Sequence, residues 1–277
     1  MKILASDFDN TIYFPDNENV TKSNIESIKK FLTKGNIFCI ITGRNYTDLK
    51  VFLNEYNIPY SYLICEDGAK IFNNMDYCID TTYLDEEMIE RVRKILDEID
   101  CDYYLDDGYN KTEYLKDVVK IVVNCKDQKE KDKIVSIIKE KVDIHIYASR
   151  THVNIINKIV NKKYALNKLI ELENLNAKIF VIGDNDNDYE MLKNFEGGVI
   201  KKHHKILNDL KKKEYDTLGD YIEELNFDLL SVIGDNDNDY EMLKAFKGAV
   251  IKKHHPILDE LNKDEYETLS DYIESLM

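Results

Sequence analysis

The sequence predicts an α/β fold, in which a core with a parallel sheet is interrupted by an inserted α+β segment. A short apolar strand followed by an amphipathic helix is the repeating order in residues 1–72, and it returns in residues 159–226. Between them, residues 73–158 have closely spaced strands and helices that are typical of an antiparallel sheet. We therefore expect a core of residues 1–72 and 159–226, a cap of residues 73–158, and a duplicated unit of residues 227–277.

Composition excludes several classes of partner. The chain has 277 residues, and 43% of them are hydrophobic, which is enough to bury a substantial core. The net charge of -15 argues against nucleic acid or an anionic membrane as the main partner, because both require a basic surface. We find no signal peptide or transmembrane segment. Five scattered cysteines without a CxxC pair indicate reduced thiols, so we expect a cytoplasmic protein.

The first part of the core alternates strands with helices. Residues 3–5 form a short apolar strand, and apolar residues fall on one face of a helix predicted over residues 21–34. Buried strands are predicted at 36–41 and 62–65, with a helix after Arg44 between them. This order predicts parallel strands joined by right-handed crossovers.

The order of strands and helices changes in the predicted cap. The elements expected there are a strand pair near 70–79, helices over 85–99 and 129–139, and strands around Tyr103 and at 118–123, 143–148 and 152–157. The strand–helix alternation returns with a helix that begins at Lys162 and a strand at 179–182. Hairpins without a crossover between their strands favour an antiparallel sheet for the insert.

The C-terminal part of the chain repeats itself. Residues 181–226 (copy one) and 232–277 (copy two) match at an offset of 51 residues, with about three quarters of the positions identical. We interpret this as a tandem duplication of one strand–helix–strand–helix unit, since two copies are too few for a solenoid. Copy two is expected to extend a sheet edge, to swap into a partner's core or to displace copy one, because an exposed copy would leave strand edges unpaired.

Four polar motifs are predicted to meet at one edge of the core sheet. They are DFDNT at 7–11, TGR at 42–44, Lys162, and GDNDND at 183–188. Each follows a predicted strand or begins a helix, and ligands of open α/β sheets bind at that edge. Asp7, Asp184 and Asp188 can converge there on a hard divalent cation, and Mg²⁺ prefers such oxygen ligands.

The order of these motifs resembles that of the haloacid dehalogenase (HAD) superfamily, and most closely its Cof-type phosphatases, whose cap lies between the second and third motifs. The resemblance covers residues 1–226 and implies a Rossmann-like core with an inserted cap that selects the substrate. It implies Mg²⁺-dependent hydrolysis of small phosphorylated metabolites, with sugar phosphates among the candidates, through an aspartyl-phosphate intermediate.

The resemblance also implies roles for individual acids. Asp7 would be the nucleophile, and Asp9 would be the general acid for the leaving alcohol and then the base for the attacking water. Mg²⁺ would be held by Asp7, by the main-chain carbonyl of Asp9 and by Asp184, with Asp188 supporting that shell. An acid at position 9 favours phosphatase over dehalogenase or phosphonatase chemistry.

Further residues would bind the substrate. By resemblance, Thr42 and Gly43 would bind the phosphoryl group and Lys162 would balance its charge. Arg44 and Asn187 are candidates for contact with the rest of the substrate, although a surface position for Arg44 is equally compatible with the sequence.

The chain departs from the family pattern in two places. Asp67 stands where the family often has asparagine, and its added charge is expected to disfavour some anionic substrates. Lys162 is followed by Lys163 instead of glycine, so position alone selects Lys162 as the lysine that faces the site. The histidine pairs at 203–204 and 254–255 are not expected to bind metal, because adjacent side chains on a strand point in opposite directions.

The sequence leaves alternatives open. Copy one is expected to be catalytic because of its spacing from Lys162, with Asp235 and Asp239 of copy two as the alternative metal set. The alternative functions are a phosphomutase that uses the same intermediate, and a catalytically silent binding or regulatory protein with a swapped repeat. The expected partner is a small phosphorylated metabolite, without nucleic acid or membrane. The oligomeric state stays open and includes a domain-swapped dimer.

Overall fold

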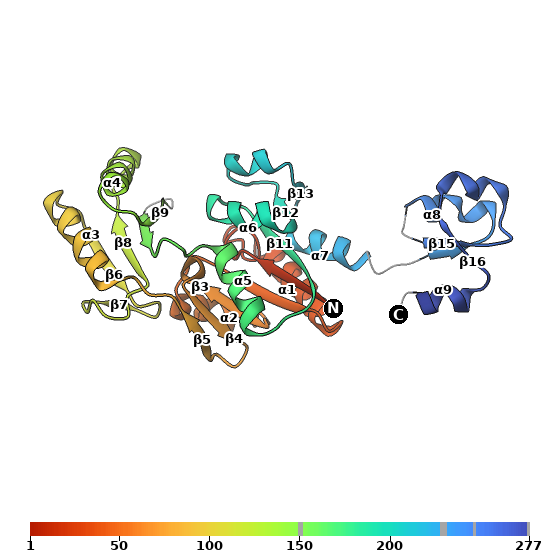
Figure 1. Cartoon of the computed structure of the whole chain (residues 1–277), viewed down its shortest axis with the longest axis horizontal. Helices are drawn as coiled ribbons and strands as arrows, with labels where there is room; N and C mark the ends of the chain where they lie inside the picture. The colour runs from red at the N-terminus through yellow and green to blue at the C-terminus, as the bar shows by residue number, and fades with distance from the viewer. Residues whose placement is uncertain (149–151, 228–231, 246–247, 276–277) are drawn as a thin grey trace. The chain divides into compact units, whose positions relative to one another are not determined.

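The computed structural model describes residues 1–148, 152–227, 232–245 and 248–275 (Figure 1). The chain divides into two compact units, Met1–Gly219 and Asp220–Met277. Parts of the predicted unit 227–277 lie outside the described residues, among them the last two residues of copy two. No helix in the described part of the chain is both long and apolar enough to cross a membrane.

An eight-stranded sheet forms the centre of the first unit, with the strand order β13-β12-β11-β1-β2-β3-β4-β5. Its strands are β1 (Lys2–Ser6), β2 (Ile37–Ile41), β3 (Tyr62–Cys65), β4 (Lys70–Asn73), β5 (Cys78–Thr81), β11 (Lys178–Gly183), β12 (Glu196–Ile200) and β13 (Lys213–Tyr215). All neighbours from β13 to β3 are parallel, whereas β4 and β5 are antiparallel. The predicted α/β fold with a parallel sheet is confirmed.

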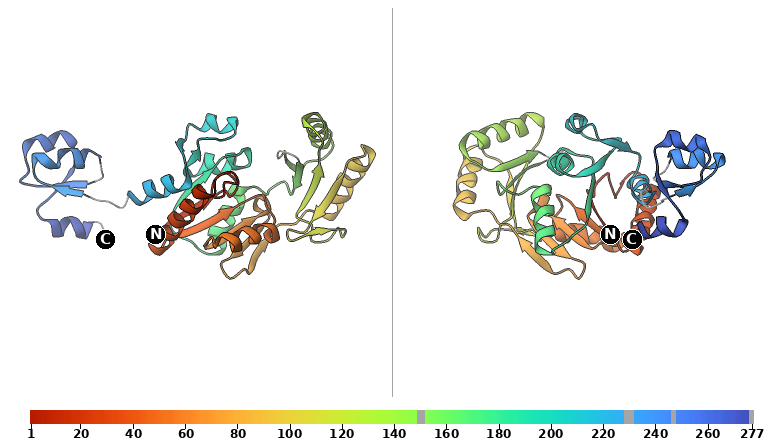
Figure 2. Two further views of the ribbon diagram at one scale, coloured as in Figure 1. Left: turned by 180° about the vertical axis from the view of Figure 1, so that it is seen from behind. Right: turned by 45° about the vertical axis from the view of Figure 1, so that its right-hand side comes forward.

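Helices cover both faces of this sheet. They are α1 (Glu18–Thr33), α2 (Tyr46–Tyr56), α5 (Lys162–Leu172) and α6 (Tyr189–Asn194), while α7 (Leu218–Phe227) crosses the boundary between the two units. α5 lies in front of the sheet in Figure 1, and α1 lies in front of it in the rear view of Figure 2. Alternate residues of β1, Ile3 and Ala5, share one buried cluster with Leu166 of α5 and Met191 of α6. This packing fixes the strand ends that carry the polar motifs.

The inserted segment forms its own five-stranded antiparallel sheet, with the order β7-β6-β8-β10-β9. Its elements are α3 (Glu86–Glu98), β6 (Tyr103–Asp106), β7 (Lys111–Thr112), β8 (Lys120–Asn124), α4 (Gln128–Lys141), β9 (His145–Ala148) and β10 (His152–Ile156). Apolar residues of α3 and α4 pack with those of the strands in a second buried cluster. Figure 1 shows the two helices together on this sheet.

The hairpin of β4 and β5 belongs to the first sheet. The sequence predicts a cap that begins at residue 73, but the structure pairs β5 with β4 at the edge of the eight-stranded sheet. A hairpin without an intervening helix looks the same in sequence whether it starts a new sheet or adds an antiparallel edge to a parallel one.

Copy two forms a separate three-stranded parallel sheet, with the order β14-β15-β16. Its elements are β14 (Val232–Gly234), α8 (Tyr240–Ala245), β15 (Gly248–Ile251), β16 (Asp264–Tyr266) and α9 (Leu269–Ser275), in the same order as the elements of copy one. In the described residues these strands pair only with one another, so copy two neither extends the eight-stranded sheet nor displaces copy one from it. In copy one β11 pairs with β1 as well as with β12, whereas β14 of copy two pairs only with β15 within the described residues.

Candidate active site

Parallel pairing of β1 with β11 brings two acidic motifs together. The register places Ser6 beside Ile182, and the backbone N–H of Asp7 donates to the carbonyl of Ile182 at 3.0 Å. Both strands therefore end at the same edge of the sheet. Asp7, Asp184 and Asp188 each offer a carboxylate oxygen there, all within 4.8 Å of one another.

Lys162 joins two of these aspartates. It begins α5, and its Nζ donates to Oδ1 of Asp7 at 2.5 Å and to Oδ1 of Asp188 at 2.6 Å. The lysine side chain is fully buried, whereas the neighbouring Lys163 is partly exposed. The structure thus places Lys162, and not Lys163, among the aspartates.

Asp188 also organises the loop that carries Asp184. Its Oδ2 accepts hydrogen bonds from the backbone N–H groups of Asp184 and Asn185, both at 3.0 Å. A Cβ atom at Gly183 would lie 2.3 Å from Cγ of Asp188, so only glycine permits this close approach. The side chain of Asp188 therefore holds the backbone of the loop that positions the carboxylate of Asp184.

The electrostatics of this group fit a bound cation. Burial raises the pKa of Asp7, and Lys162 only partly offsets that effect. Burial, and then the charge of Asp188, raises the pKa of Asp184 to about 7. Burial alone would lower the pKa of Lys162, but Asp188 and Asp7 outweigh it and raise that pKa. Three carboxylates against one ammonium leave surplus negative charge, and their oxygen atoms are the donors that Mg²⁺ prefers.

Asp9 is held by Arg44. The guanidinium Nε donates to Oδ2 of Asp9 at 2.8 Å, and Nη2 donates to Oδ1 at 2.6 Å. Arg44 also lies over the ring of Phe52, with its guanidinium carbon 4.3 Å from the ring centre. The side chain of Asp9 is 42% exposed, so it remains accessible from the cavity that it lines. The sequence predicts substrate contact or a surface position for Arg44; the structure pairs it with Asp9 at the cavity that both residues line, and substrate contact stays a prediction.

A cavity of about 220 Å³ opens on these groups. Its lining includes Asp7, Asp9, Thr42 and Gly43 of the core, and Tyr147 and Asn154 of the inserted sheet. Asn187 lines the same cavity, and Lys162 lines a smaller adjacent one of about 90 Å³. The motifs predicted from the sequence therefore meet at these two adjacent cavities, and residues of the insert form part of the wall.

The loop after β3 is tied to the TGR motif. Glu66 and Asp67 have positive φ angles of 54° and 57°, which are uncommon for residues other than glycine. The backbone N–H of Glu66 donates to the carbonyl of Arg44 at 3.0 Å, and that of Asp67 donates to the carbonyl of Thr42 at 2.9 Å. The strained backbone therefore holds the carboxylate of Asp67 beside the TGR motif.

A buried ion pair that the sequence did not predict lies behind this loop. Lys120, on β8 of the insert, forms an ion pair with Glu66 and donates from Nζ to the carbonyl of Gly43 at 3.0 Å. Both side chains are buried. Burial raises the pKa of Glu66 to about 7, although Lys120 acts in the opposite direction. The only signal in the sequence was a lysine inside the apolar run of β8.

The acidic loop of copy two repeats the local geometry of copy one. The N–H groups of Asp235 and Asn236 donate to Oδ2 of Asp239 at 3.0 and 3.2 Å. However, Asp235 is exposed and Asp239 is only partly buried. Neither joins any group of three potential metal ligands within the described residues.

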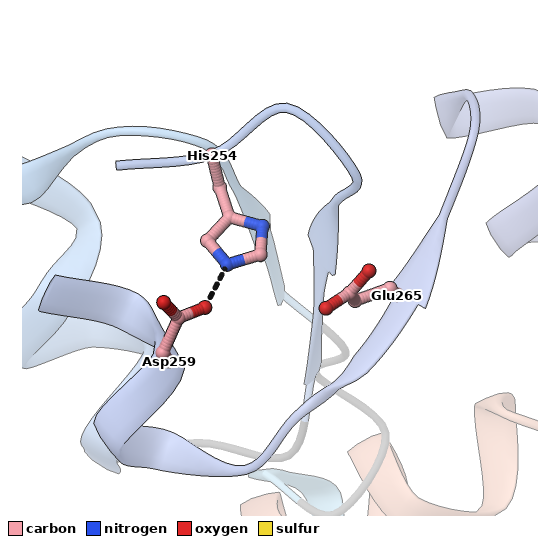
Figure 3. A group of neighbouring side chains, drawn as sticks. All are labelled: His254, Asp259 and Glu265. Carbon is pink, nitrogen blue, oxygen red and sulfur yellow. Dashed lines mark hydrogen bonds and ion pairs between the residues drawn. The ribbon is translucent and has the colours of Figure 1, made fainter. Parts of the chain in front are cut away.

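Among the described residues, one other group of potential metal ligands lies in copy two (Figure 3). Nδ1 of His254 hydrogen-bonds the carbonyl of Ile251 at 2.7 Å, Nε2 lies 2.8 Å from Oδ1 of Asp259, and Glu265 lies nearby. Asp259 raises the pKa of His254 chiefly through this hydrogen bond. His203 of copy one makes the matching bonds to Ile200 and Asn208, at 2.7 and 2.8 Å. Both ring nitrogens are engaged in each copy, so we interpret these histidines as supports of the loop.

Comparison with known proteins supports the same family. A family model described as haloacid dehalogenase-like hydrolase matches residues 4–112 and 105–205. A relative named "Putative phosphatase" from Buchnera aphidicola subsp. Schizaphis graminum is 24% identical over 228 residues, covering 69% of this chain and 80% of its own.

Solved structures show the same fold. The phosphatase BT1666 from Bacteroides thetaiotaomicron is 17% identical with a TM-score of 0.69, covering 82% of this chain and 94% of its own. The HAD subclass IIB sugar phosphatase BT4131 is 16% identical with a TM-score of 0.66, covering 82% of this chain and 98% of its own.

Proposed function

Because the chain belongs to the haloacid dehalogenase-like hydrolases, we propose that it is a Mg²⁺-dependent phosphatase of small phosphomonoesters with Asp7 as its nucleophile. The observation that carries this proposal is the close approach of the carboxylates of Asp7, Asp184 and Asp188, two of which are bonded to Lys162. Bound Mg²⁺ would supply positive charge to the phosphoryl oxygens and to the attacking carboxylate, with Asp7, the main-chain carbonyl of Asp9, and Asp184 as its protein ligands and Asp188 in support.

Asp7 and Asp9 divide the chemistry between them. An oxygen of Asp7 attacks the phosphorus atom, the bond to the leaving alkoxide breaks, and Asp9 donates a proton to that alkoxide. Asp9 then takes a proton from water, which attacks the same phosphorus atom, and the bond to Asp7 breaks to release inorganic phosphate. Arg44 orients the carboxylate of Asp9 in this scheme.

Lys162, Thr42 and Gly43 serve the phosphoryl group. Lys162 already holds Asp7 and Asp188, so its charge lies where negative charge moves onto the phosphoryl oxygens. The hydroxyl of Thr42 accepts from the N–H of Arg44 at 3.2 Å, which leaves its proton free to donate. Thr42 and Gly43 both line the cavity, as their proposed role requires.

We assign catalysis to copy one and substrate selection to the insert. The pairing of β11 with β1, which puts Asp184 near Asp7, supports the first assignment. The contribution of Tyr147 and Asn154 to the cavity wall supports the second. The likeness to the sugar phosphatase BT4131 makes sugar phosphates the first substrates to test.

Phosphate release tests the proposal. Purified protein should release inorganic phosphate from sugar phosphates or p-nitrophenyl phosphate with Mg²⁺, without an added bisphosphate, which separates hydrolysis from mutase activity. EDTA should abolish the release, and Mg²⁺ should restore it. Asp7→Asn should leave less than about a tenth of the activity, because an amide is a poor nucleophile. The exposed Asp16→Asn is the matched control, and full activity of Asp7→Asn would refute the nucleophile assignment.

A further inference from the structure

Asp67, Tyr147 and Asn187 are three of the four side chains that line both the large cavity and the smaller one beside it. Each carries a buried polar atom without a hydrogen-bond partner in the described part of the chain. These atoms are Oδ2 of Asp67, the hydroxyl of Tyr147 and Oδ1 of Asn187. Most buried polar atoms in folded proteins are paired, so three unpaired ones on residues of a shared cavity wall point to a site where a ligand could pair with them.

The free atoms have a defined hydrogen-bonding character. Nδ2 of Asn187 donates to Oδ1 of Asp67 at 2.9 Å, and a carboxylate accepts hydrogen bonds. This bond fixes the orientation of the amide and leaves Oδ1 of Asn187, an acceptor, free. Two of the three free atoms are therefore acceptors, and the third, a phenol oxygen, can also accept. A ligand that satisfies them must be rich in donors.

The charge of Asp67 further restricts the class of ligand that fits. Asp67 is only 1% exposed, and burial raises its pKa, which Lys120 only partly counteracts. Lys120 is bonded to Glu66 and Gly43, and Arg44 is bonded to Asp9. Lys162, whose charge also acts on Asp67, is bonded to Asp7 and Asp188. A cationic donor group from the ligand would therefore give the buried carboxylate of Asp67 a directly bonded cation, which Lys120, Arg44 and Lys162 do not provide.

We propose that Asp67, Asn187 and Tyr147 form a subsite for an ammonium group on the leaving alcohol of the substrate. The three N–H donors of a primary ammonium match the three free acceptors. Phosphorylated amino alcohols, such as amino-sugar phosphates, are then preferred over their hydroxyl counterparts. This inference rests on the proposed phosphatase function, because the subsite lies in the same cavity.

Two matched substrate pairs test the subsite. Glucosamine 6-phosphate and glucose 6-phosphate differ by one ammonium in place of a hydroxyl, and so do phosphoethanolamine and 2-hydroxyethyl phosphate. In at least one pair, the ammonium member should have about a tenfold higher kcat/KM, since hydrogen bonds to charged groups contribute on that scale. Asp67→Asn should reduce this ratio to about one, because the amide keeps the shape and an acceptor for Asn187 but removes the charge.

A control separates direct contact from the general field of the cavity. Asp186 lines both cavities, so Asp186→Asn removes one charge from the same space without changing Asp67. It should leave the ratio within about twofold of wild type. Equal kcat/KM values within both pairs, or a preference that survives in Asp67→Asn, would overturn the inference.

Binding distinguishes failure of this inference from failure of the proposed function. Calorimetric titration of Asp7→Asn with the same four compounds, in Mg²⁺, reads the preference without turnover. About tenfold tighter binding of an ammonium member, lost in Asp7→Asn/Asp67→Asn, would support the subsite even if no phosphate were released by wild type. Equal binding beside normal phosphate release would overturn the subsite and leave the phosphatase proposal standing.

Discussion

Replacing Lys120 by methionine should destabilise the fold strongly, because Lys120 is the cation bonded to a glutamate with no exposed side-chain surface. Its ammonium also donates to the carbonyl of Gly43. Lys120→Met keeps much of the side-chain volume but removes both interactions. The change therefore tests whether Lys120 stabilises the contact of the insert with Glu66 and with the TGR motif.

The expected loss of stability follows from leaving the buried carboxylate of Glu66 without its cationic partner. Removing one partner of a buried ion pair costs about 3–5 kcal/mol, a large share of the roughly 5–15 kcal/mol that holds a domain folded. In Lys120→Met/Glu66→Gln no charge remains, so the loss should be smaller than in the single variant by about 2 kcal/mol. The double variant is the matched control.

The loss of stability in Lys120→Met should also depend on pH. The pKa of Glu66 is raised in the folded protein from 4.5 to about 7, so its contribution to stability is present below pH 4.5 and is lost as pH rises towards 7. Without Lys120 the folded-state pKa rises further, which extends this loss to higher pH. Lys120→Met should therefore be nearer to wild type at pH 5, where Glu66 is protonated, than at pH 8.

Urea unfolding followed by far-UV circular dichroism at pH 5 and pH 8 measures both effects. Equal stability of the single and double variants, or a loss independent of pH, would refute this account of the ion pair. Phosphate release by the folded variants adds a functional measurement. A raised KM in Lys120→Met, shared by the double variant, is expected from loss of the bond to Gly43.

Three further outcomes are expected. Asp9→Asn should lower turnover by about 10²–10⁴-fold and accumulate phosphoenzyme on rapid acid quench, because the general base for water is lost; rapid turnover without phosphoenzyme would contradict its role. Ca²⁺ should inhibit the proposed Mg²⁺-dependent phosphate release, since its larger and looser shell misplaces the phosphoryl group, and equal activation by Ca²⁺ would contradict the metal assignment. Truncation after Asn226 should give a soluble and active protein, because the described strands of copy two pair only with one another; insoluble protein would show that copy two belongs to the core.

Local patterns predicted much of the fold. The strand at Tyr62–Cys65 and the start of the helix at Lys162 coincide with the structure, because apolar runs and turn residues specify them within a few positions. β13 was missed because its three residues lie at a sheet edge and two are exposed, so no apolar run marks it. β5 was assigned to the cap because pairing partners depend on distant parts of the chain.

The contacts of the candidate site also divide into those that the sequence predicted and those that it did not. The order of the motifs anticipated the meeting of Asp7, Asp184 and Lys162, since parallel strands end at a common edge. The pair of Glu66 and Lys120 joins residues of different sheets, and no local pattern reports such a contact. The bond from Arg44 to Asp9 likewise depends on how the two loops meet in space.

Copy one as the catalytic copy is the central claim, and the two acidic loops provide the matched variants that test it. Asp184 lies 9% exposed beside Asp7, whereas Asp235 occupies the same place in an identical motif and is exposed. Phosphate release should be measured for Asp184→Asn and Asp235→Asn in parallel, with Mg²⁺ at saturating substrate. We expect Asp184→Asn to abolish release and Asp235→Asn to retain it. Loss of activity in Asp235→Asn, with activity retained in Asp184→Asn, would contradict the account.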